Sequence, residues 1–259
     1  MNILILGGTG AIGRALIDLL KSTSWNVLVT SRNVRENENN IRYVKGNAHE
    51  EEFLKQCLEI EHWNAIVDFM AYSEKVDLFL NKTDQYFFLS SSRVYAESNI
   101  PITENSKRII DVCEDEEYLK TDEYALAKAR QENILFNSSK KNWTIIRPYK
   151  TYNDNRFQLG MFEKEDWLYR VMMGKTLVFP KEMAKKKTTL TNAIDVSVAI
   201  KNLIGNQAAY GEAFHITTTE SITWQNVLDI YIYFLQKSTG KHYKIKYIDN
   251  IEKFYEIWN

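Results

Sequence analysis

Short apolar runs alternate with segments of helical periodicity over the first 150 residues of the chain. The runs are rich in Ile, Val, Leu and Phe and end in glycine or polar residues, as buried strands do. Between them, apolar residues recur every three or four positions, which is typical of amphipathic helices. The pattern predicts six strands, at Asn2–Leu6, 25–30, 41–44, 64–69, 85–90 and 142–147. It predicts three helices, at 11–21, 50–61 and 122–136.

This alternation predicts an α/β fold with a doubly wound parallel sheet, because parallel strands need crossover connections that place helices on both faces. Ligands in such folds bind just beyond the carboxyl ends of the strands. The side chains that follow each strand are therefore the first candidates for function.

Beyond residue 150 the pattern loosens. It predicts a loop and helix within 157–173, helices at 192–204 and 224–237, and a strand at 243–247. We expect residues 1–150, with about 191–211, to form the domain built on this parallel sheet. We expect a small C-terminal lobe from 151–190 and 212–259, which would hold the substrate. Whether the natural chain continues past Asn259 is left open, because the last residues carry no helix-ending signal.

Composition excludes several classes of protein. The 259 residues are 44% hydrophobic and 26% charged, as in ordinary globular proteins. The net charge of -1 argues against binding to nucleic acid or membrane driven by overall charge, and we expect neither as a partner. Two cysteines and four histidines show no disulfide or metal-ligand spacing. No apolar stretch reaches the ~18 residues of a membrane span. We expect a cytoplasmic protein with a small-molecule substrate and no metal.

A glycine-rich turn follows the first strand and opens the first helix. It fits G-x-G-x-x-G, in which glycines permit a tight turn and let backbone N–H groups approach a phosphate at the helix N-terminus. A plain tight turn is the alternative, and the strand-turn-helix context favours a dinucleotide site. We therefore expect residues 1–150, with about 191–211, to be a Rossmann dinucleotide-binding domain. The predicted cofactor-binding residues here are Gly7, Gly8, Thr9, Gly10, Ala11, Ile12 and Gly13.

The end of the second strand bears on which dinucleotide is bound. NAD enzymes place an acidic residue about 20 residues after the turn to hold the ribose 2′-hydroxyl. This chain has Ser31 and Arg32 there, and a guanidinium suits a 2′-phosphate. NADP(H) is favoured and NAD(H) remains possible.

Hydroxyl side chains gather after the fifth strand, in Ser90, Ser91 and Ser92, and about 30 residues later comes Tyr124-x-x-x-Lys128. On a helix these last two share a face. A phenol titrates near pH ~10, so proton transfer near neutrality needs a cationic neighbour such as Lys128. The spacing alone does not decide, since Tyr233 and Lys237 repeat it without such surroundings.

The order of the motifs is more specific. A glycine turn, S-S-x-x-V-Y, Y-x-x-x-K, and R-P after the next strand resemble the short-chain dehydrogenase/reductase superfamily, in its extended or atypical branch, the NAD-dependent epimerase/dehydratase family. The resemblance implies an enzyme that acts on nucleotide sugars. It implies that Ser91 hydrogen-bonds the reacting oxygen, Tyr124 is the general acid/base, and Lys128 binds the nicotinamide ribose and lowers the tyrosine pKa.

The resemblance also extends the candidate site. It implies cofactor contacts from Asn47, in the place of an adenine-binding Asp, and from Met70 and Ala71 after the fourth strand. The candidate substrate-binding residues are Ser91, Ser92, Arg147 and Tyr149. A homodimer is possible, as in many members of the family.

One departure narrows the chemistry. Sugar dehydratases of the family carry Asp-Glu after the catalytic hydroxyl residue, where this chain has Ser92 and Arg93. Without a carboxylate to move the proton, dehydration is disfavoured, and epimerisation or keto-sugar reduction is expected. The alternatives are a small-carbonyl reductase and a non-catalytic member that acts as a dinucleotide sensor or binds RNA.

Overall fold

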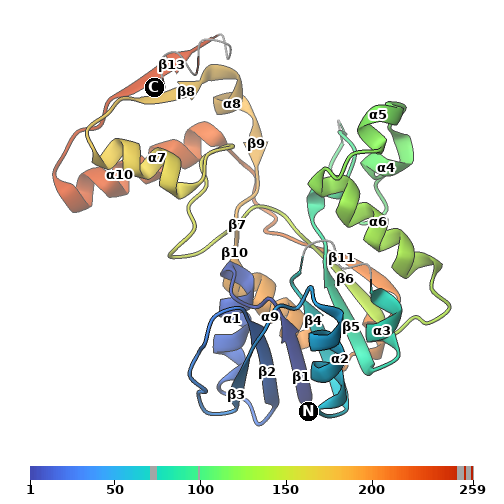
Figure 1. The fold of residues 1–259 in the computed structure, drawn as a ribbon. Coiled ribbons are helices and arrows are strands. Elements are labelled where there is room, and N and C mark those ends of the chain that lie inside the picture. The colour runs from blue at the N-terminus through green and yellow to red at the C-terminus, as the bar shows by residue number, and fades with distance from the viewer. Residues whose placement is uncertain (71–74, 99, 250–253, 255–257, 259) are drawn as a thin grey trace. The chain divides into compact units, whose positions relative to one another are not determined.

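The structure is a computed structural model that describes residues 1–70, 75–98 and 100–249, together with Phe254 and Trp258. The chain divides into two compact units (Figure 1). The first unit comprises Met1–Tyr149 and Asn192–Thr217, and the second comprises Lys150–Thr191 and Thr218–Asn259.

The first unit is built on a parallel sheet that has seven strands within the described residues. The strand order is β11-β6-β5-β4-β1-β2-β3, and every neighbouring pair is parallel. The strands are β1 (Asn2–Leu6), β2 (Asn26–Ser31), β3 (Ile41–Lys45), β4 (Trp63–Asp68), β5 (Thr83–Leu89), β6 (Trp143–Pro148) and β11 (Glu212–Ile216). The predicted doubly wound parallel sheet is confirmed, with the chain order reversing between β1 and β4.

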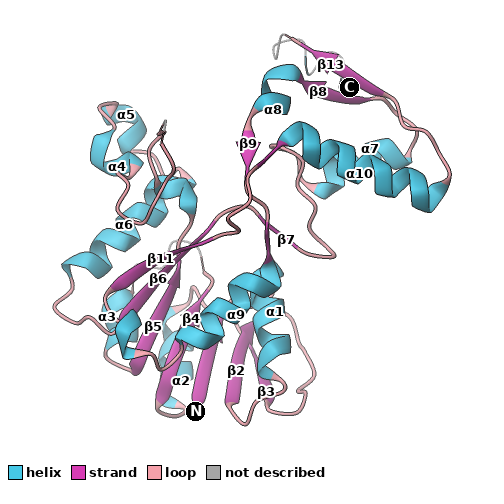
Figure 2. Ribbon diagram, turned by 180° about the vertical axis from the view of Figure 1, so that it is seen from behind, coloured by secondary structure: helices cyan, strands magenta, loops and turns pink. Residues whose placement is uncertain are grey.

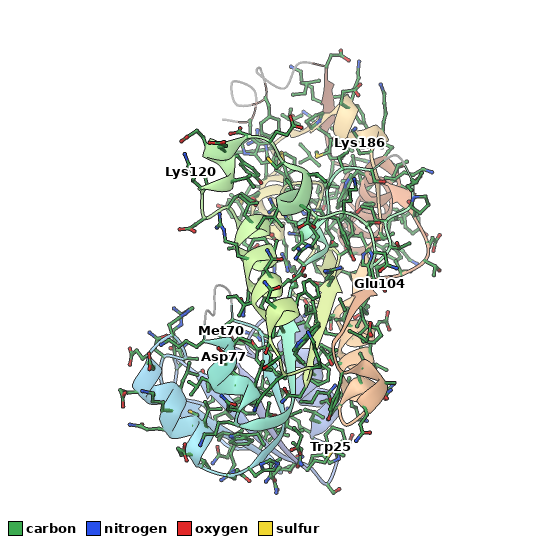
Figure 3. All side chains as sticks on the ribbon, turned by 90° about the vertical axis from the view of Figure 1, so that its right-hand side faces the viewer. Trp25, Met70, Asp77, Glu104, Lys120 and Lys186 are labelled. Carbon is green, nitrogen blue, oxygen red and sulfur yellow. The ribbon has the colours of Figure 1, made fainter. Side chains whose placement is uncertain are left out.

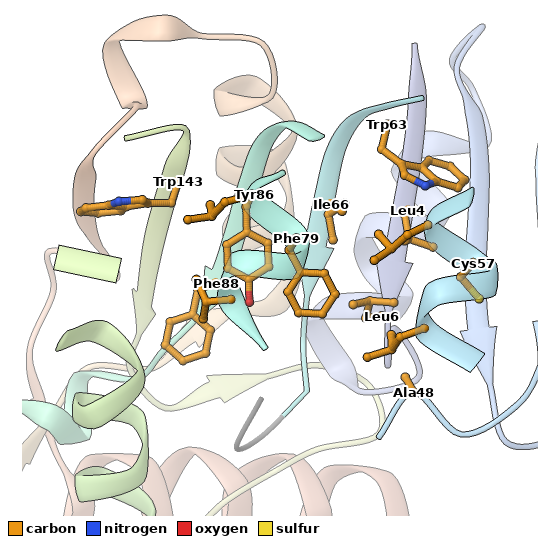
Figure 4. Packing of buried hydrophobic residues seen from close by; sticks show 14 of the residues in the cluster. Leu4, Leu6, Ala48, Cys57, Trp63, Ile66, Phe79, Tyr86, Phe88 and Trp143 are labelled. Atoms are coloured by element: carbon orange, nitrogen blue, oxygen red, sulfur yellow. The ribbon is translucent and has the colours of Figure 1, made fainter. Parts of the chain in front are cut away.

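Helices cover both faces of this sheet (Figure 2). Alternate residues of β1 point to opposite faces, so Ile3 and Ile5 pack with α1 (Ala11–Leu20) and α9 (Ala193–Leu203). Leu4 and Leu6 pack on the other face, where Figure 4 shows them with Phe79 and Cys57. The helices on that face are α2 (Glu51–Glu59), α3 (Val76–Leu80) and α6 (Tyr124–Asn137).

One strand differs from the sequence expectation. The pattern assigns 212–259 to the second lobe, whereas β11 pairs with β6 from Glu212↔Thr144 to Ile216↔Pro148 and lies in the first unit. The strand is at the sheet edge and none of its residues is fully buried. Its short, mixed sequence therefore lacks the continuous apolar run that marks the other strands.

The second unit has a small core of its own. Strand β8 (Leu177–Pro180) pairs in parallel with β13 (Ile245–Ile248), and α7 (Lys164–Met172) and α10 (Trp224–Thr239) supply the core residues Trp167 and Trp224. Short elements complete the chain: η1 (Ser92–Val94), α4 (Ile109–Val112), α5 (Glu116–Leu119), β7 (Thr151–Tyr152), α8 (Lys181–Lys185), β9 (Lys187–Thr188), β10 (Thr191–Asn192), η2 (Gln207–Ala209) and β12 (Ile222–Thr223).

In the part of the chain that the structure describes, no helix combines the length and the apolar character that a membrane crossing requires.

Candidate active site

The glycine turn begins with a residue that only glycine suits. Gly7 follows β1 with φ at 73°, in the left-handed region, and a Cβ there would lie 2.6 Å from Sδ of Met70. The Gly7 N–H donates to Oγ1 of Thr30 at 3.2 Å, which ties the turn to the end of β2. The Thr9 N–H donates back to the Gly7 carbonyl at 2.7 Å.

The N-terminus of α1 offers backbone donors to a ligand. Gly10 is the N-cap residue and contributes no side-chain hydrogen bond, and the first turn holds no acidic residue. A Cβ on Gly10 would meet nothing within 4 Å, whereas a Cβ on Gly13 would lie 2.6 Å from the Gly8 Cα. An open surface over uncapped N–H groups, with the helix packed tightly against the turn behind it, fits the pyrophosphate of a dinucleotide.

Two further segments border this turn. Ser31 at the end of β2 is buried, and its Oγ accepts from Nε of Arg35 at 3.3 Å, while Arg32 is exposed. Asn47 follows β3, and its Oδ1 accepts from the His49 N–H at 3.1 Å. The sequence analysis did not single out Arg35, although its spacing from Ser31 in S-R-N-V-R placed a second guanidinium in reach.

Lys128 is buried among protein groups at the carboxyl edge of the sheet. Its Nζ donates to the carbonyls of Leu89, at 2.7 Å, and Met70, at 3.2 Å, and its side chain is 3% exposed. Burial lowers the pKa of Lys128 to about 8, and the nearby carboxylates of Asp68 and Glu132 oppose that shift. Met70, labelled in Figure 3, thus contacts both Lys128 and the glycine turn. Ala71 lies outside the described residues.

Tyr124, Ser91 and Arg93 meet at the same edge. The helix α6 starts at Tyr124 because Glu123 caps it, accepting from the Ala125 N–H. The Arg93 guanidinium lies 5.6 Å from the centre of the Tyr124 ring, and the Arg93 N–H donates to Ser91 Oγ at 3.2 Å. The Lys128 Nζ lies 5.9 Å from the same ring centre.

A buried ionic network stands behind these residues. Arg147 donates from Nε and Nη2 to the Glu132 carboxylate and from Nη1 to Tyr95 and to the Glu104 carbonyl. Its guanidinium is therefore held by protein acceptors. Ser90 donates to Glu132 at 2.6 Å. Glu132 was missed in the sequence, although it lies one helical turn after Lys128.

The other candidate residues lie close by. Ser92 is 9% exposed, and its Oγ has no hydrogen-bond partner within the described part of the protein. Tyr149 follows β6 and is partly buried. In the described ranges, no three His, Cys, Asp or Glu side chains gather in a way that could hold a metal ion.

The chain is similar to known proteins in sequence and in fold. Residues 3–86 match the sequence profile of the NAD dependent epimerase/dehydratase family. A curated relative, the chloroplast stem-loop binding protein of 41 kDa b from Arabidopsis thaliana, is 26% identical over 247 residues, which cover 87% of this chain. The chain spans 61% of the length of that relative.

Solved structures share the fold. The dTDP-glucose 4,6-dehydratase of Bacillus anthracis, in complex with NAD, aligns with a TM-score of 0.72 at 17% identity over 100% of this chain and 90% of its own. The UDP-glucuronic acid 4-epimerase of Bacillus cereus, in complex with UDP-glucuronic acid and NAD, aligns with a TM-score of 0.69 at 16% identity, covering 97% and 87%.

The resemblance to the NAD-dependent epimerase/dehydratase family is therefore confirmed over residues 3–86, and the solved structures share the fold of the whole chain. The matched residues begin in β1, pass through the glycine turn and end in β5.

Proposed function

We propose that this protein is an NAD(P)-dependent epimerase or keto-reductase that acts on a nucleotide sugar. The observation that carries the proposal is the buried ammonium of Lys128, which donates to the carbonyls of Leu89 and Met70 and lies 5.9 Å from the centre of the Tyr124 ring, while Met70 also packs against the glycine turn. A lysine side chain is seldom buried away from solvent unless a binding partner or a function of the protein requires its burial.

The side chains have complementary roles in this proposal. The Ser91 hydroxyl donates to the reacting oxygen of the sugar, and the Tyr124 hydroxyl takes or returns the proton on that oxygen. The charge of Lys128 favours the phenolate while the proton is away. A nicotinamide bound over the glycine turn supplies or accepts hydride.

Arg147 and Ser92 have different roles in this proposal. Because Glu132 and Tyr95 hold the Arg147 guanidinium, we propose that Arg147 supports the wall of the site. The buried, unpaired Oγ of Ser92 and the partly buried Tyr149 remain candidates for contact with the substrate. Ser92 and Arg93 supply no carboxylate, so the proposal excludes dehydration of the kind catalysed by family members with Asp-Glu at these positions.

We further propose that the cofactor is NADP(H) rather than NAD(H). The support is local: Ser31, Arg32 and Arg35 border the end of β2, and no acidic residue occupies Thr30–Arg32 to hold a 2′-hydroxyl. The solved relatives named above are complexes with NAD, so the finer preference rests on these residues alone.

Tyr124→Phe tests the proposed chemistry. Native mass spectrometry of the purified protein first identifies the dinucleotide that it carries, and hydride exchange is then measured with a panel of UDP- and dTDP-sugars. We expect Tyr124→Phe to abolish exchange without weakening cofactor binding, while Tyr233→Phe, at the same spacing on α10 and 59% exposed, leaves exchange unchanged. Cofactor binding with no exchange on any sugar by the wild type would identify a sensor instead.

RNA binding is a second candidate, and two observations favour it. The name of the curated relative describes stem-loop binding. The charge is also divided: the second unit carries 14 Lys and Arg against 10 Asp and Glu, and the first carries 19 against 24. Such a charge asymmetry between two parts of one chain is a feature of some nucleic-acid-binding proteins.

Binding of a labelled stem-loop RNA at increasing salt tests this second candidate. Phosphate contacts predict that affinity falls steeply with salt, and that replacing Lys185, Lys186 and Lys187 by Glu weakens it. The matched control replaces Lys82, Lys120 and Lys140 of the first unit by Glu. Equal, salt-insensitive binding by both triple variants would rule out an RNA site on the basic unit.

A further inference from the structure

We propose that Asp68 is a positioning residue for Lys128: its carboxylate fixes the backbone of Met70, which holds Lys128 Nζ, and supplies the negative charge that keeps this buried ammonium protonated. The inference deepens the proposed function, on which the role of Lys128 rests. Asp68 ends β4 and is buried there.

The carboxylate of Asp68 has a donor on each oxygen. The Met70 N–H donates to Oδ1 at 2.7 Å, and the Tyr86 hydroxyl donates to Oδ2 at 2.7 Å. Asp68 and Tyr86 are both 0% exposed. Burial raises the pKa of Asp68, and the hydrogen bonds from Tyr86 and Met70, together with the charge of Lys128, oppose that shift. Two donors for two oxygens match an ionised carboxylate, which only accepts hydrogen bonds, better than a carboxylic acid, which must also donate one.

Met70 connects this carboxylate to the lysine. Its N–H is held by Asp68, and its carbonyl accepts from Lys128 Nζ at 3.2 Å. Its Sδ lies where a side chain on Gly7 would have to go. Fixing the Met70 backbone therefore fixes one of the two acceptors of Lys128 and one wall of the glycine turn.

Charge distinguishes Asp68 from the other carboxylate near Lys128. Glu132 on α6 also favours the protonated lysine, but Arg147 and Arg108 bind its oxygens and offset its charge. Within the described residues, Asp68 forms no ion pair with an arginine. Among the residues that the structure describes, the other titratable groups that act on the pair are Tyr86 from β5, Tyr124 from α6, and His49.

The alternative is that Asp68 only satisfies two buried donors and its charge has no consequence for Lys128. Asp68→Asn separates the two possibilities, because the amide oxygen still accepts from Met70 and the amide nitrogen donates to the Tyr86 oxygen. Both contacts of residue 68 are kept and its charge is lost, while the Tyr86 hydroxyl loses Asp68 as its acceptor.

The experiment is a pH titration of the Lys128 side chain by NMR in protein labelled with [13C]lysine, with the Lys128 signal assigned by its absence in Lys128→Met. We expect a midpoint near pH 8 in the wild type, and a midpoint lower by about one pH unit in Asp68→Asn. Tyr86→Phe, which removes a hydrogen bond but keeps the carboxylate, should not lower it. An unchanged midpoint in Asp68→Asn would overturn the proposal.

Two additions make the result unambiguous. If Asp68→Asn does not fold, Asp68→Ser removes the same charge with a smaller side chain and must give the same lowered midpoint. Calorimetric dissociation constants for NADPH at two pH values supply the link to function: Asp68→Asn should weaken binding more at pH ~8 than at pH ~6, as Lys128 loses its proton. The two proposals can fail separately. If Tyr124→Phe stays active while Asp68→Asn lowers the Lys128 midpoint, the proposed chemistry is refuted and the inference on Asp68 holds.

Discussion

Glu132 on α6 and Arg147 on β6 form a two-pronged ion pair, with Nε and Nη2 of the arginine each 2.8 Å from a carboxylate oxygen. The two side chains are 0% and 2% exposed. The pair joins the helix that carries Tyr124 and Lys128 to the strand beside β5. The position of the proposed acid/base residues therefore depends on this buried contact.

Replacing Glu132 by Gln should lower the free energy of unfolding by about 3–5 kcal/mol, because Arg147 would keep its burial and lose its counter-charge. Urea denaturation measures the change. The control is Glu117→Gln, which breaks the exposed pair with Lys120 and should cost less than about 1 kcal/mol. Equal midpoints for the two variants would mean that the buried pair contributes no more than a surface one.

Two glycines of the same turn should respond differently to alanine. Gly13→Ala would place a Cβ 2.6 Å from the Gly8 Cα, so we expect lost stability as well as lost dinucleotide binding. Gly10→Ala meets no protein atom within 4 Å and should cost about 1 kcal/mol or less as a poorer N-cap, but its methyl group enters the space over the uncapped N–H groups. Thermal melts with and without NADPH compare them. Tight NADPH binding by Gly10→Ala would place the phosphates elsewhere.

Much of the fold follows from local signals. The buried strands β1, β2, β4 and β5 are visible in the sequence as apolar runs. The turn between β1 and α1 has glycine at positions 7 and 13, where a Cβ would lie 2.6 Å from a neighbouring atom. The edge strand β11 was not predicted, because a half-exposed strand of mixed residues has no such apolar run. Its place in the sheet is decided by pairing with β6, which is a long-range contact.

The site was less accessible to sequence reasoning. Motif order brought out Ser91, Tyr124 and Lys128, which the structure gathers at one edge of the sheet, while their roles remain predictions. Asp68 and Glu132 were missed because a single acidic residue at the end of a strand or within a helix is normally solvated. Only the tertiary structure shows that both side chains are fully buried. Asp68 accepts from Tyr86 and from a backbone N–H, whereas Glu132 pairs with Arg147.

Cofactor preference should depend on Arg32. In Arg32→Ala, we expect the dissociation constant for NADPH to rise by about 10-fold or more, the worth of a charge-assisted hydrogen bond, and that for NADH to stay unchanged. Fluorescence titration of both nucleotides measures this. Arg42→Ala, which removes an exposed guanidinium paired with Glu61 in the connection between α2 and β4, serves as the control and should alter neither constant. Tighter binding of NADH than NADPH by the wild type would overturn the preference.

The buried ammonium of Lys128 should also leave a mark on stability. Its pKa is lowered from 10.5 to about 8 in the folded protein, so between these values the unfolded chain binds more protons and the free energy of unfolding must rise with pH. The full contribution is about 3 kcal/mol across that window. Other groups titrate there too, so the quantity to measure is the difference in unfolding free energy between the wild type and Lys128→Met, by urea denaturation at several pH values. We expect the free energy of unfolding of Lys128→Met to lack this rise with pH. Relative to the wild type, Lys128→Met should therefore be most stable at pH values below about 8, where the wild type keeps a charge in its interior. If the difference in unfolding free energy stays constant with pH, Lys128 is solvated in the folded state. Its ammonium then does not destabilise the fold, and the idea that the protein accepts lower stability in return for a buried charge at the site is wrong.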